Sequence, residues 1–463
     1  MHIKQTIALV TIALLVKLFA ILSTNFDLFG DEAQYWIWSQ NMDFGYYSKP
    51  PLLAWVIGGF SSLFGSSFEA LKIIPAGTYV LSSFVVGLIS QELYNNKKLA
   101  LLSGATFYLM PAVSVSSFLI STDVILILFW SLSLLFLLRT RKNPKTINFF
   151  ILGIFLGLSF LAKYAAIYFL LSMVVLVFLD KATKKIFFKK FFYFVFFLGT
   201  SFVVLLPNIV WNIKNNWVTL SHTSDNASLN KINFNLLQGG EFILTQGMMV
   251  GPLLFVFFLI SMNKIKYNFA TKFLLSFSLP VLFVVLGESI LVRANANWAA
   301  VALISLSIFF TNHVYNLSKK ILVTNSIINF CICVVLFFFI SSTSSLKFFN
   351  RINGISSFAT TLVEKHMGDI NFLVVEDRLL FSNLKYILNE SQKKIYTSYE
   401  PGKKITSSFH LSDPLPPTFN KSFIFLGNIG EINYLIKKNQ IKKIEQIKVI
   451  FKRSEIEVYE VTF

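Results

Sequence analysis

Over about its first 340 residues the chain repeats one pattern, long apolar runs separated by short polar connections. Runs of roughly 17 to 22 mostly apolar residues have the length that a helix needs to cross the hydrocarbon core of a bilayer. A helix also satisfies its own backbone hydrogen bonds where no water is available. The runs therefore predict about eleven transmembrane helices, near residues 4–22, 75–93, 99–119, 122–138, 147–162, 164–180, 189–210, 241–262, 270–290, 298–314 and 321–342.

The composition agrees with this class and excludes others. Of the 463 residues, 55% are hydrophobic and 14% are charged, which is too apolar for a soluble enzyme of this length. The net charge of +18 is of the kind found in proteins that bind nucleic acid. The basic residues, however, occur in short clusters between apolar runs and form no single basic face. We therefore expect a polytopic α-helical membrane protein that does not bind nucleic acid.

The basic clusters also predict the orientation in the membrane. Every second connection is basic, and basic connections tend to stay in the cytoplasm. The first long loop, 24–74, and everything after residue 342 are then extracytoplasmic. We expect a multi-pass protein of the cytoplasmic (inner) membrane. The basic connections contain Lys97 and Lys98, Arg139 to Lys145, Lys181 to Lys190, Lys264 and Lys266, and Lys319 and Lys320.

After residue 342 the pattern changes. Apolar runs shorten to strand length, as in Phe372 to Val375 and Phe423 to Leu426, and charged helical patterns alternate with them. This composition predicts a small soluble α/β domain. The expected organisation is a transmembrane domain over residues 1–342, whose first extracytoplasmic loop is 24–74, and an extracytoplasmic α/β domain over residues 343–463.

The loop 24–74 carries charges whose position needs a reason. Asp31 and Glu32 follow the first apolar run, and Lys49 precedes two prolines. The carboxylates could act as a general base and its orienting partner, because transfer to a hydroxyl or amine requires removal of a proton. Lys49 could neutralise a phosphate leaving group. Alternatively, Asp31 caps the next helix and Lys49 reaches toward the membrane surface.

Several motifs occur in an order that resembles a known family. They are Asp31-Glu32 with a downstream aromatic, Gly45-Tyr46-Tyr47, Lys49-Pro50-Pro51, Ser121-Thr122-Asp123, Gly157 to Tyr164, Leu206-Pro207-Asn208 with Trp211-Asn212, and Asn297-Trp298-Ala299-Ala300. Together they cover roughly residues 1 to 310. The chain resembles the GT-C membrane glycosyltransferases, specifically bacterial relatives of protein O-mannosyltransferases and of the lipid A aminoarabinose transferase. Many relatives have His before the two prolines, whereas this chain has Lys49, as the aminoarabinose transferase does.

The resemblance implies transfer of a sugar from a polyprenyl-phosphate carrier to an acceptor on the outer face of the membrane. The acceptor could be lipid A, another glycan or a protein. By matching positions, Asp31 is the base or acceptor-positioning carboxylate, with Glu32 beside it. Substrate contacts are implied for Lys49, Tyr35, Tyr47, Asp123, Lys163, Tyr164 and Arg293. We expect these side chains to converge on one pocket, with Asp31 close to Lys49.

Other interpretations of these residues stay open. Asp123 could be a helix N-cap, and Lys163 and Arg293 could bind lipid headgroups. We expect no metal site, because no second histidine or cysteine lies at ligand spacing from His222. No cofactor is expected either, and a divalent cation is compatible with the carboxylates but not required.

Two rival functions belong to other classes. One is a transporter or flippase of lipid-linked substrates, and the other is a scaffold whose soluble domain binds envelope partners. Transporters usually place ionisable groups near the middle of the bilayer, often in repeated halves. Here the charges gather at one edge and no repeat is visible. The pattern therefore favours an enzyme.

Overall fold

The computed structural model describes residues 3–227, 232, 234–435, 441–449 and 454–463. Residue contacts divide the chain into two units. The first, here called the helical unit, comprises residues 1–21, 43–53 and 72–338. The second, here called the sheet unit, comprises residues 22–42, 54–71 and 339–463. The predicted domain boundary at 342/343 stays a prediction, but the first loop contributes to both units.

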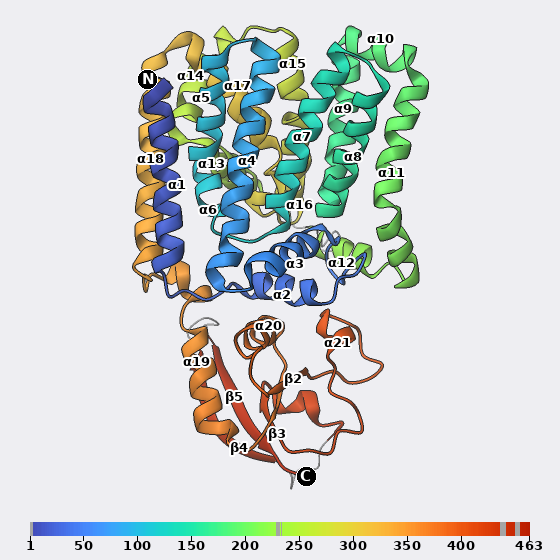
Figure 1. Ribbon diagram of the computed structural model, residues 1–463, viewed down its shortest axis with the longest axis vertical. Coiled ribbons are helices and arrows are strands. Elements are labelled where there is room, and N and C mark those ends of the chain that lie inside the picture. The colour runs from blue at the N-terminus through green and yellow to red at the C-terminus, as the bar shows by residue number, and fades with distance from the viewer. Residues whose placement is uncertain (1–2, 228–231, 233, 436–440, 450–453) are drawn as a thin grey trace. The chain divides into compact units, whose positions relative to one another are not determined.

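The helices of the first 341 residues are shown in Figure 1. They are α1 (Ile3–Ser23), α2 (Gly30–Gln40), α3 (Leu52–Phe64), α4 (Phe68–Tyr94), α5 (Lys97–Leu109), α6 (Pro111–Ser116), α7 (Thr122–Lys142), α8 (Thr146–Ala162), α9 (Ile167–Leu179), α10 (Lys181–Lys189), α11 (Phe191–Lys214), α12 (Val218–Ala227), α13 (Leu236–Val250), α14 (Pro252–Ser261), α15 (Phe269–Ser276), α16 (Leu279–Leu291), α17 (Ala302–Leu317) and α18 (Lys319–Ser341). The short 3₁₀ helices η1 (Tyr164–Ala166) and η3 (Ala296–Ala299) lie between them.

Within the described residues, six helices are long and apolar enough to cross a membrane, or up to eight if two bent pairs each form one span. Every predicted run coincides with helical structure, but the expected count of about eleven spans is not confirmed. Helix breakers interrupt several runs. Met110 and Pro111 separate α5 from α6, and Gly251, at φ +140°, separates α13 from α14 at a bend of 111°.

Two glycines on one face of α8 allow it to pack closely against α11. A Cβ atom on Gly153 would lie 2.6 Å from the carbonyl oxygen of Phe197, and one on Gly157 would lie 2.6 Å from the Cβ of Val204. Small residues four apart are a common means of close approach between membrane helices. This packing fixes the end of α8, where Lys163 and Tyr164 follow, relative to the end of α11.

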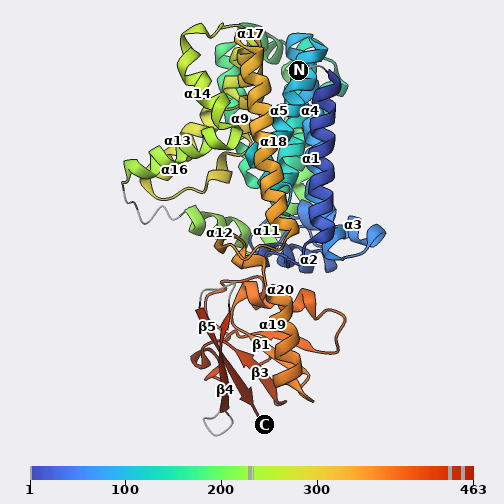
Figure 2. The ribbon, with the colours of Figure 1, turned by 90° about the vertical axis from the view of Figure 1, so that its left-hand side faces the viewer.

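The basic connections lie together in the helical unit. Figure 1 shows α10 and the α4–α5, α7–α8, α14–α15 and α17–α18 connections at the end where the chain begins. The α6–α7 connection and α12 lie at the opposite end. Figure 2 shows α1 and α18 running side by side between the two ends. The alternation that the basic clusters predict is therefore present in the fold.

The sheet unit contains a five-stranded sheet in the order β2-β1-β3-β5-β4. Its strands are β1 (Phe372–Val375), β2 (Lys394–Thr397), β3 (Phe423–Leu426), β4 (Ile441–Val449) and β5 (Ser454–Val461). Strands β1, β2 and β3 are parallel, and β5 is antiparallel to β3 and β4. Helices α19 (Ile355–Leu362), α20 (Arg378–Ile387) and α21 (Phe409–Ser412) complete the unit. Its core is formed by buried side chains of β1, β3 and β5 with Leu415 and Ile432.

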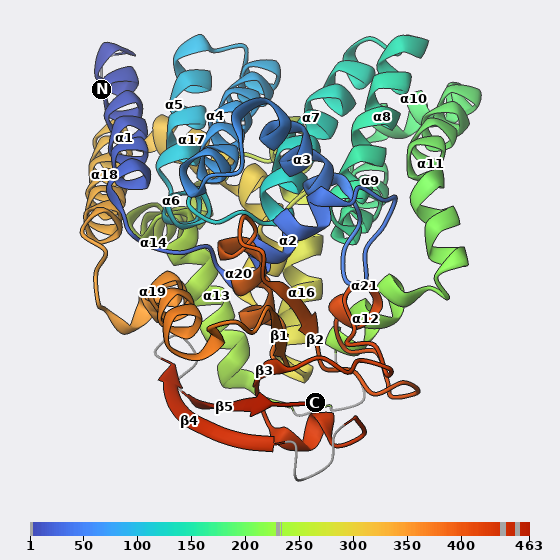
Figure 3. The ribbon, with the colours of Figure 1, turned by 60° about the horizontal axis from the view of Figure 1, so that its bottom comes forward.

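Helix α2, from the first loop, packs along α20 of the sheet unit, as Figure 3 shows. Gly30 permits the close approach, because a Cβ atom there would lie 2.7 Å from the Cβ of Leu379. Trp36 meets Tyr386 edge to face, with ring centroids 5.0 Å apart. The segment that carries the acidic motif is therefore built into the same unit as the sheet.

Candidate active site

In the helical unit, Asp123 is the centre of a polar cluster. Lys163 Nζ lies 2.7 Å from Asp123 Oδ1, and Asn297 Nδ2 donates to Asp123 Oδ2 at 2.9 Å. The side chains of Lys163 and Asp123 are only 18% and 14% exposed, so water screens this ion pair weakly. Ser121 is the N-cap residue of α7 and Asp123 lies in the first turn, where a carboxylate is favoured by the helix dipole.

The segment before Asp123 is held by a buried lysine. Lys72 is fully buried on α4, and its Nζ donates to the carbonyl oxygen of Phe118 at 3.0 Å. The same ammonium lies 4.3 Å from the centroid of the Phe118 ring. A charged group inside the membrane-embedded part needs such partners. Lys72 therefore fixes the connection that leads into the Asp123 cluster.

A second cluster joins Tyr164 to the end of α11. Tyr164 Oη donates to Asn208 Oδ1 at 2.7 Å, and Asn212 Nδ2 donates to Tyr164 Oη at 3.0 Å. Asn208 Nδ2 in turn donates to the carbonyl oxygen of Phe44 at 2.7 Å. The predicted residues Lys163 and Tyr164 are thus adjacent in the chain, but they bind different partners.

The segment 43–49 is bound to α11 and α12 by polar contacts. Trp211 Nε1 donates to Asp43 Oδ2 at 2.6 Å, and Thr219 Oγ1 donates to the carbonyl oxygen of Tyr46 at 2.7 Å. The amide of Tyr46 donates to the carbonyl oxygen of Lys49 at 3.1 Å, which closes a turn. These bonds order the backbone on both sides of Lys49, whose side chain is half-buried.

Burial has a chemical consequence for Tyr46. It raises the pKa of Tyr46 to about 12, chiefly by desolvation of the charged form. The hydroxyl is protonated at neutral pH, as in an ordinary tyrosine, and it accepts a hydrogen bond from the backbone amide of Asp43 at 3.1 Å. Through this hydrogen bond, Tyr46 stabilises the turn.

The two remaining predicted contacts of this unit lie on different elements. The Tyr47 ring meets the His222 ring of α12 at a centroid distance of 5.0 Å. Arg293 is exposed in the connection between α16 and η3, four residues before Asn297. Within the described part of the chain, Arg293 forms no ion pair. Its guanidinium is available to an anion.

In the sheet unit, Asp31 pairs with an arginine of α20. Arg378 Nη1 donates to Asp31 Oδ1 at 2.8 Å, and it also donates to Oε1 of the buried Gln34. Arg378 lies in the first turn of α20, where a positive charge is disfavoured by the helix dipole. Asp31 offsets that cost. The Asp31 side chain remains 40% exposed, so a substrate can still reach it.

Glu32 and Tyr35 are less accessible than Asp31. Glu32 is 1% exposed, and its Oε2 accepts a hydrogen bond from the backbone amide of Phe29 at 2.8 Å. The carboxylate thereby satisfies a free amide at the start of α2. Tyr35 is 8% exposed and packs against Trp38. The structure gives both residues roles in building α2.

The structure therefore brings the predicted residues together in separate groups. Asp123 and Lys163 form one pair, and Tyr164 and the segment of Tyr47 and Lys49 are both bound to the α11–α12 region. Asp31, Glu32 and Tyr35 lie on α2 in the other unit. The expected proximity of Asp31 to Lys49 stays a prediction.

Sequence reasoning missed several residues of these clusters. Asp43, Lys72, Gln34 and Arg378 were not predicted. Arg378 had a detectable signal, because Glu376-Asp377-Arg378 follows a buried strand directly, and polar residues at the carboxyl ends of parallel strands often face ligands. Asn208, Trp211 and Asn297 belong to motifs of the family resemblance, but no role was assigned to them.

No group of three or more His, Cys, Asp or Glu side chains suited to a metal ion occurs among the described residues. Asp123 and Asp31 each face a cation of the protein rather than a second carboxylate. A reaction that needs no metal or cofactor stays a prediction.

Comparison with solved structures decides the fold. ArnT from Cupriavidus metallidurans bound to undecaprenyl phosphate superposes with a TM-score of 0.68 over 99% of this chain and 98% of that chain, at 12% identity. The chain has the ArnT fold. The oligosaccharyltransferase of Archaeoglobus fulgidus in complex with Zn and sulfate is similar over 90% of this chain and 67% of that chain, with a TM-score of 0.52 and 14% identity.

Sequence comparison agrees with the fold. Residues 48–211 match the family model described as dolichyl-phosphate-mannose-protein mannosyltransferase. The lipid A galacturonosyltransferase RgtD of Rhizobium johnstonii is 30% identical over 295 residues, which are 62% of this chain and 61% of RgtD. The lipopolysaccharide core galacturonosyltransferase RgtB of the same organism is 28% identical over 145 residues, 31% of this chain and 29% of RgtB.

The predicted resemblance to GT-C membrane glycosyltransferases is thus confirmed, in the fold and in the matched segment. The class of a multi-pass α-helical membrane protein with a small sheet is confirmed as well. The chain spans about 61% of the length of RgtD.

Proposed function

We propose that this protein transfers a sugar from a polyprenyl-phosphate donor to a glycolipid acceptor. The first candidate reaction is transfer of galacturonic acid to lipid A, because RgtD bears that activity in its name. The donor class is suggested by the undecaprenyl phosphate bound to ArnT. The observation that carries the proposal is Asp31, a partly exposed carboxylate held by Arg378 at the start of α2.

The reaction replaces one bond to the sugar by another. The bond between the anomeric carbon and the phosphate oxygen breaks, and polyprenyl phosphate leaves with the electron pair. A bond forms between the anomeric carbon and an oxygen of the acceptor, whose proton passes to the Asp31 carboxylate. Arg378 holds that carboxylate in one orientation, as a base in transfer chemistry requires.

The charge that develops on the leaving phosphate needs cations. We assign this role to Lys49, whose turn is fixed by Tyr46, and to the exposed Arg293. Lys163 and Asp123 form a fixed dipolar pair near Asn297 of η3, which follows the connection that carries Arg293. No cofactor is part of this proposal, and a divalent cation is not required.

We also propose an orientation. The basic connections face the cytoplasm, and the opposite end of the helical unit faces the outside of the inner membrane. Asp123, Lys163, Arg293 and the segment 43–49 then act outside the cytoplasm, where nucleotide sugars are absent and a lipid-linked donor is available. The sheet unit belongs to the same compartment in this proposal.

The test compares glycolipids of cells with and without the protein by mass spectrometry. The proposal expects lipid A from deletion cells to lack the mass of one hexuronic acid residue, and the wild-type chain to restore it. The Asp31→Asn variant should reduce product by about 100-fold or more, since it removes a general base. Identical lipid A in both strains would exclude this acceptor, and full restoration by Asp31→Asn would exclude Asp31 as the base.

A further inference from the structure

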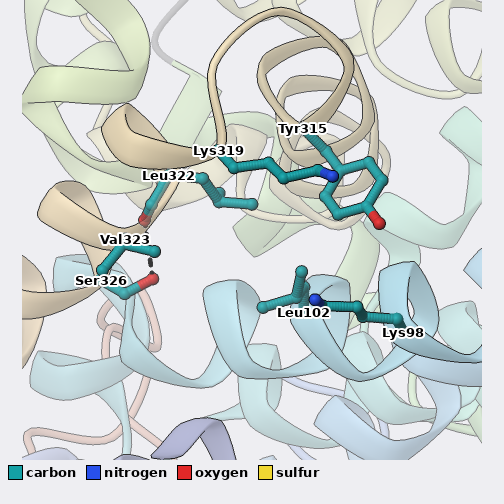
Figure 4. Close-up of a pocket in the computed structure, with 7 residues that line it drawn as sticks. All are labelled: Lys98, Leu102, Tyr315, Lys319, Leu322, Val323 and Ser326. Atoms are coloured by element: carbon teal, nitrogen blue, oxygen red, sulfur yellow. Dashed lines mark hydrogen bonds between the residues drawn. The ribbon is translucent and has the colours of Figure 1, made fainter. Parts of the chain in front are cut away.

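A shallow pocket lies at the basic end of the helical unit, away from the clusters described above. Figure 4 shows its lining, which comes from the start of α5, the end of α17 and the start of α18. The lining residues are Lys98, Leu102, Tyr315, Lys319, Leu322, Val323 and Ser326. No role in sugar transfer explains this combination of side chains.

The rim of the pocket is cationic. Lys98 and Lys319 contribute two ammonium groups, and the Lys319 Nζ lies 5.2 Å from the centroid of the Tyr315 ring. Contact with the ring restricts the lysine side chain, so less entropy is lost when an anion binds. No acidic residue lines the pocket.

The acidic residues near the connections of this end are bound elsewhere. Glu92 pairs with Arg139 at 3.4 Å and with Lys142 at 2.6 Å, and Asp180 pairs with Arg141 at 3.1 Å. Neither Lys98 nor Lys319 belongs to an ion pair within the described ranges of the chain. The positive charge of the pocket is therefore uncompensated by the protein.

The floor of the pocket is apolar. Leu102 and Leu322 are 6% and 2% exposed, and Val323 lies beside them. The hydroxyl of Ser326 is occupied, because it donates to the carbonyl oxygen of Leu322 at 2.9 Å. An inorganic phosphate ion would gain nothing from such a floor. A molecule with an anionic head and an apolar stem matches both parts.

We propose that this pocket binds the headgroup of an anionic phospholipid. Its phosphate lies between Lys98 and Lys319, and the first carbons of its chains lie on Leu102 and Leu322. α18 is one of the helices that can span the membrane, so the pocket lies where a lipid of the adjacent leaflet can enter. A bound headgroup bridges α5 and α18 and reduces the positive charge at the α17–α18 junction.

The test uses the purified full-length protein in detergent, titrated with phosphatidylglycerol or phosphatidylcholine of the same acyl chains and followed by native mass spectrometry. The wild type should bind phosphatidylglycerol at least about fivefold more tightly, since each lysine near an anionic surface contributes measurably. The variant K98Q/K319Q should lose this preference. The matched control K264Q/K266Q removes the same amount of charge from exposed lysines outside the pocket. This variant should keep the preference for phosphatidylglycerol.

Three outcomes would overturn the proposal. They are an unchanged preference in K98Q/K319Q, an equal loss in K264Q/K266Q, and displacement of phosphatidylglycerol by inorganic phosphate at an equal concentration. The variant K98R/K319R keeps the charge and should keep the preference, so a loss there would also count against it. Elution of each variant as a single species in size-exclusion chromatography verifies that it is folded.

Discussion

Arg378 Nη1, in the first turn of α20, donates a 2.8 Å hydrogen bond to Asp31 Oδ1, in the first turn of α2. The two residues are 347 positions apart in the chain. Helix α2 belongs to a loop between apolar runs, and α20 belongs to the sheet unit. The pair gives the sheet unit a specific part in the proposed chemistry, which is to position the carboxylate that receives the proton.

Removal of Arg378 should therefore affect the rate more than substrate binding. We expect Arg378→Ala to lower kcat about 10-fold or more with a smaller change in KM, because a misoriented base loses its alignment. Arg378→Lys should restore part of the rate, since it returns the charge without the fork of donors. Transfer is measured in membranes supplied with undecaprenyl-phosphate-linked galacturonic acid.

A matched control separates positioning from packing. Tyr386→Phe removes the 2.8 Å hydrogen bond from Tyr386 Oη to the carbonyl oxygen of Ser66 and keeps the ring contact with Trp36. It does not touch Asp31, so kcat should stay close to wild type. Equal losses in Arg378→Ala and Tyr386→Phe would mean that Arg378 only holds the unit together.

The ion pair of Asp123 and Lys163 should be strongly coupled. Lys163→Met leaves a poorly solvated carboxylate, and we expect a loss of roughly 1–3 kcal/mol, below that of a fully buried pair because the side chains are partly exposed. The double variant with Asp123→Asn should lose less than the sum of the single variants. Thermal unfolding of the four proteins in detergent completes the cycle, and additive losses would contradict the coupling.

Lys49 and Arg293 should act on the donor. We expect Lys49→Ala and Arg293→Ala each to lower kcat/KM for the polyprenyl-phosphate donor about 10-fold or more, because a hydrogen bond to a charged group contributes roughly 1.5–3 kcal/mol. Lys214→Ala, at the exposed end of α11, provides a charge-matched control. Phosphate recognition by the two residues is refuted if donor dependence is unchanged in both.

The sheet unit should lose stability in mild acid through His410. Burial lowers the pKa of His410, whose ring lies 4.8 Å from the Tyr399 ring. Below the ordinary value of 6.5 the unfolded chain takes up a proton that the folded chain resists, so stability falls until the pH passes the folded pKa. His410→Gln should make the thermal unfolding midpoint depend less on pH between about pH 7 and pH 5. An unchanged slope would exclude His410.

The helical class, the alternation of basic connections and the strands Phe372–Val375 and Phe423–Leu426 could be predicted, because each depends on local composition. The number of spans could not. Gly251 with a positive φ bends a continuous apolar run, and hydropathy does not register the bend. Lys163 and Asp123 could be selected as unusual charges beside apolar helices. Their mutual contact could not, because it depends on how α7 and α8 pack.

The sequence by itself determined which segments avoid water and where charge is placed, since both follow from the order of side chains along the chain. Only the tertiary structure decided which charges meet. Arg378 of α20 reaches Asp31 of α2, and Trp211 of α11 reaches Asp43 in the segment 43–49, although the partners are distant in sequence. The physical reason is that close packing, such as Gly30 against Leu379, sets which residues contact one another in space. The periodicity of side chains along the sequence does not contain that information.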